Sequence, residues 1–171
     1  MMDIVIASRE HAALVAQISR QSFDEAFSPT NDQDDMADYM DTAFTEGQIA
    51  EELEDVQNTF LLCSTKEGAC GISKLRRGVP APEKIGNATS IELQRLYVIE
   101  KAHGKGVGRA LLEKSMEIAR KEGVAYIWLG VWEHNPKAIR FYQNMGFEFC
   151  GSHDFVLGRD VQTDLEMYRR L

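Results

Sequence analysis

The chain has 171 residues, 44% of them hydrophobic and 27% charged, and its net charge at pH 7 is −8. This content is enough for one buried core, so a single domain over residues 1–171 is expected. The acidic balance argues against nucleic acid as a partner, and the lack of a long apolar run or a signal-like N-terminus indicates a soluble, cytoplasmic protein without a membrane span.

The acidic residues are concentrated early in the chain. Residues 21–65 contain 12 Asp or Glu and no Lys or Arg, whereas the remainder holds 15 acids and 19 bases. This polarity suits a cationic ligand on one side of the protein and an anionic ligand on the other. Periodicity and breaker residues predict, in chain order, a strand at 4–6, a helix from Ser8 to about Phe27, an acidic helix at 32–44, a helical turn at 48–53, and a hairpin of strands at 59–64 and 69–75.

The second half of the chain alternates strands with helices. A surface loop with two prolines and two glycines is expected over 76–89. The elements that follow are a strand at 91–98, a helix from Val107 that ends at Gly123, a strand at 125–132, a helix at 135–145, and two strands at 147–157 and 163–171 joined by a loop at 158–162. Helices around one sheet therefore define an α/β fold class.

Three glycines mark the start of the helix after strand 91–98. Gly104, Gly106 and Gly108 lack Cβ atoms, so backbone N–H groups there can point at one anion with the helix N-terminus behind them. The spacing GxGxG is not the dinucleotide pattern GxGxxG, and Gly108 is not followed by the Lys and Ser or Thr of a P-loop. A phosphate site of another class is therefore predicted.

Two groups of motifs resemble the GCN5-related N-acetyltransferase (GNAT) family. The first is Leu96-Tyr97-Val98 followed by His103-Gly104-Lys105-Gly106-Val107-Gly108, which is similar to that family's strand and pyrophosphate loop. The second is Leu129-Gly130-Val131-Trp132-Glu133-His134-Asn135 followed by Ala138-Ile139-Arg140-Phe141-Tyr142-Gln143-Asn144-Met145-Gly146-Phe147. Over the whole chain, including the stretches SFDEAFSPTNDQDDMADYMDTAF and TDLEMYRRL, the similarity is to bacterial polyamine acetyltransferases of the PaiA type.

The resemblance implies a fold and a cofactor. The fold is one mixed, mostly antiparallel sheet flanked by helices, with a V-shaped splay between strands 91–98 and 125–132. The cofactor is acetyl-CoA, released as CoA, and the family's loop usually opens with Gln or Arg where this chain has His103. The implied cofactor-binding residues are Leu96, Tyr97, Val98, His103, Gly104, Lys105, Gly106, Val107, Gly108, Arg109, Asn135, Ala138 and Tyr142.

Two residues are predicted to be catalytic. A primary amine is mostly protonated at pH 7, so attack on a thioester needs a base, and Glu92 stands where the resemblance places one. Strand alternation predicts that Glu92, Gln94, Leu96 and Val98 share one face. Tyr142 matches the general acid that protonates the leaving thiolate. The other readings are a solvent-facing or ion-paired carboxylate for Glu92 and a core aromatic residue for Tyr142.

No metal site is expected. Cys63, Cys70 and Cys150 are odd in number and lack paired CxxC spacing, which predicts reduced, mostly buried thiols. His103 and His134 lie on predicted loops with no carboxylate at a fixed spacing, so exposed or ligand-flanking histidines are expected.

The acceptor is predicted to be a small molecule with a primary amine, a polyamine such as spermidine or spermine. Asp34, Asp35 and Asp38 would hold its distant ammonium groups, while Glu92 and Trp132 would line its pocket. Aminoglycosides and protein N-termini or lysines are alternative acceptors, and an acetyl-CoA-binding regulator without turnover is an alternative from another class. The exposed C-terminal strands favour a homodimer.

Overall fold

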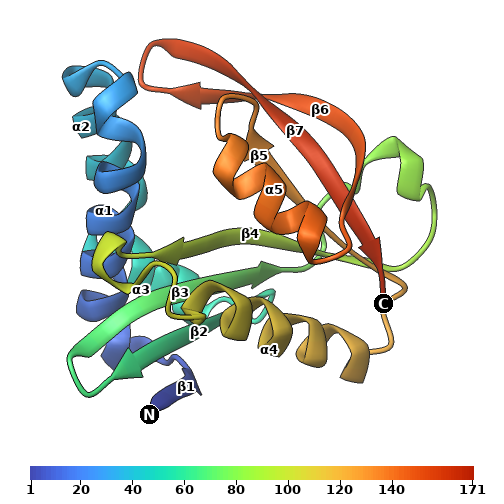
Figure 1. The fold of residues 1–171 in the computed structure, drawn as a ribbon, viewed down its shortest axis with the longest axis horizontal. Helices are drawn as coiled ribbons and strands as arrows, with labels where there is room; N and C mark the ends of the chain where they lie inside the picture. Colours follow the sequence, from blue (N-terminus) through green and yellow to red (C-terminus); the bar gives the residue numbers. More distant parts are fainter.

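The computed structural model describes all 171 residues and has one seven-stranded sheet at its centre. Its strands are β1 (Met2–Ile6), β2 (Asn58–Thr65), β3 (Gly68–Arg76), β4 (Ser90–Val98), β5 (Tyr126–Trp132), β6 (Glu148–Leu157) and β7 (Asp160–Arg170). The order across the sheet is β1-β2-β3-β4-β5-β7-β6, and only β4 and β5 pair in parallel. The predicted mixed, mostly antiparallel sheet is therefore confirmed (Figure 1).

Five helices flank the sheet: α1 (Ala12–Phe27), α2 (Gln33–Ala43), α3 (Glu46–Glu54), α4 (Val107–Lys121) and α5 (Pro136–Asn144). Side-chain caps fix three of the starts: Asp32 accepts the N–H groups of Asp34 and Asp35 at the start of α2, Thr45 accepts that of Gln48 at the start of α3, and Asn135 caps α5. None of the five is both long and apolar enough to cross a membrane.

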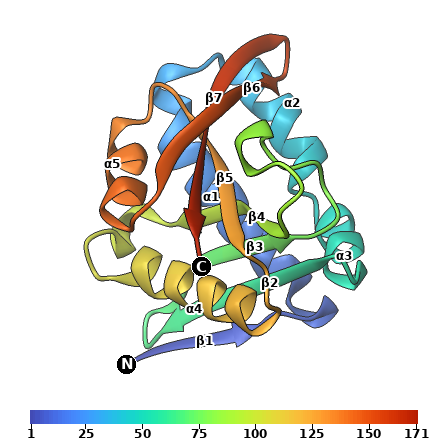
Figure 2. The same cartoon turned by 90° about the vertical axis from the view of Figure 1, so that its right-hand side faces the viewer.

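The helices cover opposite faces of the β2–β4 part of the sheet. Figures 1 and 2 show α4 on one face and α1 to α3 on the other. On the α4 face, the hydroxyls of Ser73 and Ser115 are 2.9 Å apart in the buried interface. On the other face, Phe23 and Phe44 pack on the sheet in the larger hydrophobic cluster. The acidic segment of the sequence thus forms the helices that cover one particular face.

A β-bulge corrects one prediction about β4. Its register with β3 shifts between Lys74 and Leu75, so that Arg95 opposes Lys74 and Leu93 opposes Leu75, with Gln94 as the extra residue. Because one inserted residue inverts the alternation, residues before and after it that are two or four apart no longer share a face. Glu92 lies with Arg95 on the α3 face, whereas Leu96, opposite Ser73, lies on the α4 face. The predicted common face from Glu92 to Val98 is wrong.

The C-terminal hairpin is longer than predicted. The expected loop at 158–162 shrinks to a turn at Gly158 and Arg159, and β7 begins at Asp160. A Cβ atom on Gly158 would lie 2.6 Å from the Cα of Asp35, and its positive φ of 59° also favours glycine. The tip of the hairpin therefore packs directly against the start of α2, a tertiary contact that extends both strands.

Candidate active site

The parallel strands β4 and β5 separate soon after they meet. They pair only at Ser90 with Tyr126, Ile91 with Ile127, and Glu92 with Trp128. Beyond these three pairs, residues 93–98 of β4 and 129–132 of β5 continue as strands without a strand partner between them. The predicted V-shaped splay is confirmed. Unpaired backbone N–H and C=O groups along this gap are available to an extended ligand that enters between the two strands.

The glycine loop lies at the mouth of the splay. Gly104 and Gly106 have φ values of 74° and 81°, and a Cβ atom on either would have no protein atom within 4 Å. No side chain caps α4 at Gly106, so the free N–H groups of its first turn face open space. This arrangement fits a phosphate group, which the helix N-terminus also favours electrostatically.

The loop contacts both β4 and α5. Gly108, in the first turn of α4, lies close to both elements, since a Cβ atom there would be in van der Waals contact with Phe141 at 3.7 Å and with Val98 at 3.8 Å. His103 is exposed; its Nε2 lies 2.8 Å from the carbonyl oxygen of Val98, and its Nδ1 lies 3.2 Å from Lys137 Nζ. His103 therefore links the loop to β4 and α5.

Asn135 and Tyr142 lie at the two ends of α5. The side-chain oxygen of Asn135 accepts the N–H of Ala138 at 3.1 Å and so caps the N-terminus of the helix. Tyr142 packs edge-on against Phe141 and Phe147, and burial raises the pKa of its hydroxyl above the usual value. The hydroxyl therefore stays protonated at neutral pH, the state that a proton donor needs.

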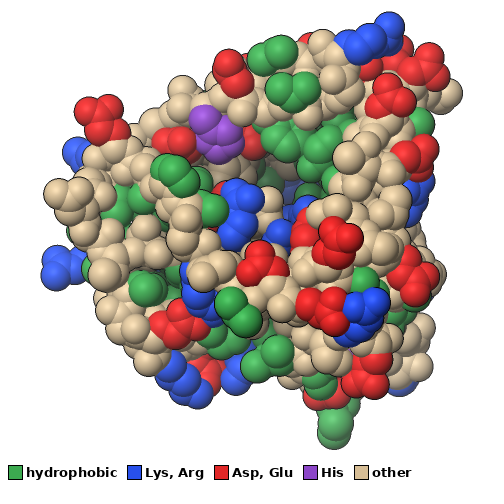
Figure 3. Space-filling view, turned by 180° about the vertical axis from the view of Figure 1, so that it is seen from behind, with side chains coloured by type: hydrophobic (Ala, Val, Ile, Leu, Met, Phe, Trp, Pro, Cys, Tyr) green, Lys and Arg blue, Asp and Glu red, His purple; other side chains and the backbone are tan.

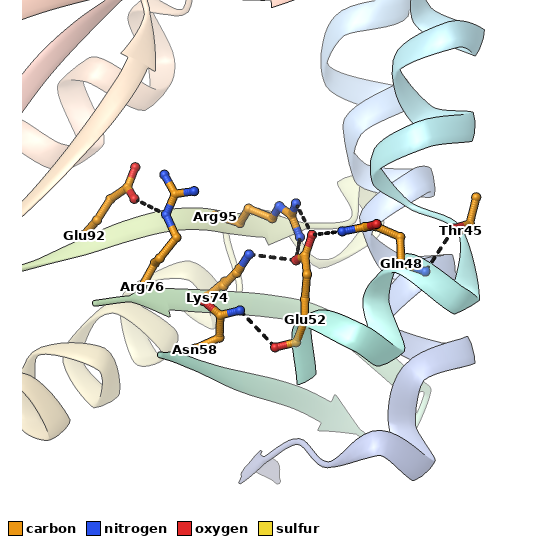
Figure 4. Close-up of polar contacts among 8 residues, drawn as sticks. All are labelled: Thr45, Gln48, Glu52, Asn58, Lys74, Arg76, Glu92 and Arg95. Carbon is orange, nitrogen blue, oxygen red and sulfur yellow. Dashed lines mark hydrogen bonds and ion pairs between the residues drawn. The ribbon is translucent and has the colours of Figure 1, made fainter. Parts of the chain in front are cut away.

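Glu92 lies at the base of the splay, where it forms the last pair of β4 and β5 with Trp128. Its side chain is 9% exposed, and its Oε2 accepts a hydrogen bond from Arg76 Nε at 2.7 Å. Figure 4 shows both side chains extending from neighbouring strands toward the same side of the sheet. Glu92 is thus ion-paired, and the pair lies on the face that α1 to α3 cover.

A buried ion cluster stands beside this pair. Glu52 of α3 accepts hydrogen bonds from Lys74 and from Arg95, each at 2.7 Å, and the side-chain exposures are 14%, 4% and 7% (Figure 4). Burial and the neighbouring Arg95 lower the pKa of Lys74 to about 8, despite its bond to Glu52. Burial opposes ionisation of Glu52, but the two cations hold its pKa below the usual value. Sequence analysis missed this cluster.

The face with the ion pairs is hollowed. Figure 3 shows basic side chains within the hollow and acidic side chains around it. Near the open end of the splay, a pocket of about 400 Å³ is lined by Phe27, Trp132 and Asn135, together with Ala26, Thr30 and His134. Trp132 packs edge-on against Phe27 at 5.8 Å between ring centroids. The structure therefore brings the predicted acceptor residue Trp132 next to the predicted cofactor residue Asn135.

The three aspartates of α2 have different environments. Asp35 is 6% exposed and accepts hydrogen bonds from the backbone N–H and the Nε of Arg159, both at 3.0 Å, which lower its pKa. Asp34 and Asp38 are exposed on the helix surface. The carboxylate of Asp35 is thus already paired, and the hairpin contact it makes is structural.

A splayed sheet with a glycine loop at a helix N-terminus fits an extended ligand that carries a phosphate group, such as a coenzyme A thioester. The sequence-family model described as "Acetyltransferase (GNAT) family" matches residues 20–147. The chain therefore belongs to the GNAT family of acetyltransferases. It is an acetyl-CoA-dependent N-acetyltransferase, and a binding regulator without turnover is not favoured, because its relatives are named as N-acetyltransferases.

Three comparisons describe what the chain is similar to. The "uncharacterized N-acetyltransferase in pepI 3'region" of Lactobacillus delbrueckii subsp. lactis is 30% identical over 98% of this chain and 96% of its own length. The spermine/spermidine N(1)-acetyltransferase of Bacillus subtilis strain 168 is 38% identical, over only 37% of this chain and 42% of its own. The PaiA N-acetyltransferase of Thermoplasma acidophilum, solved with coenzyme A, superposes with a TM-score of 0.80 over 100% and 99% of the two chains, at 19% identity.

Replacing Gly106 by alanine should weaken acetyl-CoA binding. The new Cβ atom would lie in the open space in front of α4, where the phosphate is expected. Holding an alanine at a positive φ also raises the free energy of the loop conformation by about 1–2 kcal/mol. We expect the KM for acetyl-CoA to rise about tenfold, which corresponds to about 1.4 kcal/mol, with kcat little changed. Steady-state kinetics measures both.

Gly123→Ala is the matched control for this variant. Gly123 follows α4 at its other end, has a φ of 73°, and likewise has no atom within 4 Å of an added Cβ. It should lose similar stability while keeping the normal KM. Equal KM values for the two variants would show that the loop does not bind the cofactor.

Proposed function

We propose that the acetyl group is transferred to a primary amine of a small cationic molecule, a polyamine such as spermidine or spermine. The observation that carries this proposal is the placement of the acidic segment: residues 21–65, with 12 acids and no Lys or Arg, include the end of α1 and all of α2 and α3, on the face where Glu92 lies. Such a surface attracts polycations. The name of the Bacillus subtilis relative points the same way, although its match is partial.

The residues of the site suit direct transfer in a ternary complex. Acetyl-CoA supplies an activated thioester, so the chain need not form a covalent acyl intermediate of its own. Backbone N–H groups along the splay can donate to an acyl oxygen as negative charge develops there. The amine nitrogen would add to the acyl carbon first, and the C–S bond would break as the charge on the oxygen is lost.

Two protons move in this reaction, and we assign one residue to each. Glu92 accepts the proton that the amine loses, directly or through water, because it is the carboxylate at the base of the splay. Tyr142 donates a proton to the leaving sulfur, since burial keeps its hydroxyl protonated. Proton transfer by a positioned group typically contributes about 10²–10⁴-fold in rate.

Spermidine should be acetylated with a kcat/KM at least tenfold above that of n-butylamine, which has the same reacting group but a neutral tail. A difference of about tenfold corresponds to one favourable charge contact of about 1.4 kcal/mol. A thiol-release assay with acetyl-CoA, extended to aminoglycosides and basic peptides, measures the ratios. Equal rates for spermidine and n-butylamine, or a faster aminoglycoside, would contradict the polyamine assignment.

A further inference from the structure

A second group of charged residues faces the acceptor side of the sheet, on β6 and β7. The imidazole of His153 bridges two carboxylates: Nδ1 lies 3.0 Å from Glu166 Oε1, and Nε2 lies 3.6 Å from Asp164 Oδ2. The neighbouring carboxylate of Asp164 and the hydrogen bond with Glu166, opposed by burial, raise the pKa of His153 to about 9. The imidazole is therefore a cation at neutral pH, held between two acids that are each 15% exposed.

Strand geometry places this cluster beside the splay. Glu166 pairs with Gly130 and Asp164 pairs with Trp132, so the two acids alternate along β7 on the same face as these residues of β5. A Cβ atom on Gly130 would lie 2.7 Å from His153 Cε1 and 3.2 Å from Asp164 Oδ2. The absence of a side chain at Gly130 is what lets the ring lie over β5, next to the unpaired edge of the splay.

Two tryptophans frame the cluster, and one has an unused hydrogen-bond donor. Trp128 and Trp132 flank Gly130 on the same face of β5, and indole faces attract ammonium ions. Trp128 is 6% exposed, and its buried Nε1 has no hydrogen-bond partner, nor does the buried Oε1 of Gln94 on β4. A buried polar group without a partner is unfavourable. The Trp128 Nε1–H is a donor and cannot bind an ammonium ion, whereas the Oε1 of Gln94 is an acceptor without a protein partner.

We propose that Asp164 and Glu166 bind a second, non-reacting ammonium group of the acceptor at the place that the His153 imidazole holds in the free protein. The argument rests on the function proposed above, and it assigns acceptor selection to β7 instead of α2. His153 is 39% exposed, so a small cation can reach the carboxylates as the ring moves aside. The site therefore prefers acceptors with two amino groups over those with one.

The test compares 1,5-diaminopentane with n-pentylamine, which differ only in the second ammonium group. In Asp164→Asn and Glu166→Gln, and more so in the double variant, the KM for the diamine should rise about tenfold or more. This follows from the loss of a charge-assisted hydrogen bond to the second ammonium group. The kcat/KM for n-pentylamine should change less than about twofold. Asp154→Asn is the matched control, because Asp154 is exposed on β6 next to His153, on the opposite face of the strand.

His153→Ala should act in the opposite direction, which a merely structural cluster would not do. Removal of the resident cation frees both carboxylates, so the KM for the diamine should fall several-fold. Added diamine should also raise the melting temperature of this variant more than that of the wild type, since a ligand stabilises in proportion to its affinity. This variant keeps the test decisive if the double variant does not fold.

The outcomes separate this inference from the proposed function. The subsite is overturned if Asp164→Asn and Glu166→Gln slow the acetylation of the diamine and of the monoamine equally. It is also overturned if His153→Ala raises the KM for the diamine. If the wild type acetylates no polyamine, the proposed function fails, and calorimetry with 1,5-diaminopentane then decides the subsite alone. Binding that is lost in Asp164→Asn supports it, and absence of binding to the wild type overturns it.

Discussion

Replacing Glu52 by glutamine is expected to lower the free energy of unfolding by about 3 kcal/mol or more. Glu52 is the only carboxylate bonded to Lys74 and Arg95, and both cations are almost fully buried. Removal of one partner from a buried ion pair typically costs about 3–5 kcal/mol, because the remaining charge stays desolvated. For a chain of this size, the melting temperature should fall by about 6–12 °C.

The pH dependence identifies the cause. Without Glu52, the pKa of Lys74 should fall below its value of about 8, because the hydrogen bond and charge that raise it are gone. The lysine can then lose its proton between the lower pKa and pH 8, so the deficit relative to the wild type should be smaller at pH 8 than at pH 6. Thermal melts at the two pH values measure this difference.

A neighbouring residue provides the control. Glu54 lies on the same helix and pairs with Arg9, but their side chains are 53% and 66% exposed. An exposed pair contributes little, so Glu54→Gln should change stability by no more than about 1 kcal/mol. If Glu52→Gln lowers the free energy of unfolding by no more than this, or by an amount that does not vary with pH, the buried cluster does not stabilise the fold.

The fold and the cofactor side could be predicted because their signals are local. Periodicity located each helix to within a few residues, and the glycines at 104 and 106 require the positive φ values that the structure has. The motif order from Leu96 to Phe147 then identified the family, and with it the splay. Each of these features is determined within a short stretch of chain, where only a few residue types fit the required backbone geometry or periodicity.

On the acceptor side, the register of strand pairing decides which side chains lie together. A single sequence gives little indication of that register. No glycine or proline marks the bulge at Gln94, yet it reverses the face of every later residue of β4. Glu52 looks like one more acid of a solvated helix, because its partners are 22 and 43 residues away. The alternation of Asp164 and Glu166 with Leu165 was visible, but its meaning required the pairing of β7 with Gly130.

Glu92→Gln should reduce kcat/KM for the amine about 10²-fold, with acetyl-CoA binding unchanged. The amide keeps the shape of the side chain but accepts no proton. The deficit should shrink as the pH approaches about 10, where a primary amine begins to lose its proton without help. Arg76→Gln breaks the same ion pair and retains the carboxylate, so it should lose less activity. A larger loss in Arg76→Gln would mean that the pair is structural.

Tyr142→Phe should also lower kcat about 10²-fold, since it removes only the proposed proton donor. The ring contacts with Phe141 and Phe147 remain, so the melting temperature and the affinity for CoA should not change. Tyr126→Phe, which removes a hydroxyl from a stacked ring at the far end of β5, is the control. Activity above about half of the wild-type value would exclude Tyr142 as the donor.

The double variant then tests whether the two proton transfers belong to one step. If Glu92 and Tyr142 lower the same barrier, the loss in Glu92→Gln/Tyr142→Phe should approach the product of the single losses, whereas if they act in successive steps it should stay near the larger single loss. If the amine loses its proton before attack and the sulfur gains one only afterwards, a single variant leaves one step normal and changes which of them limits the rate. The pH dependence of the double variant should then follow the slower of the two.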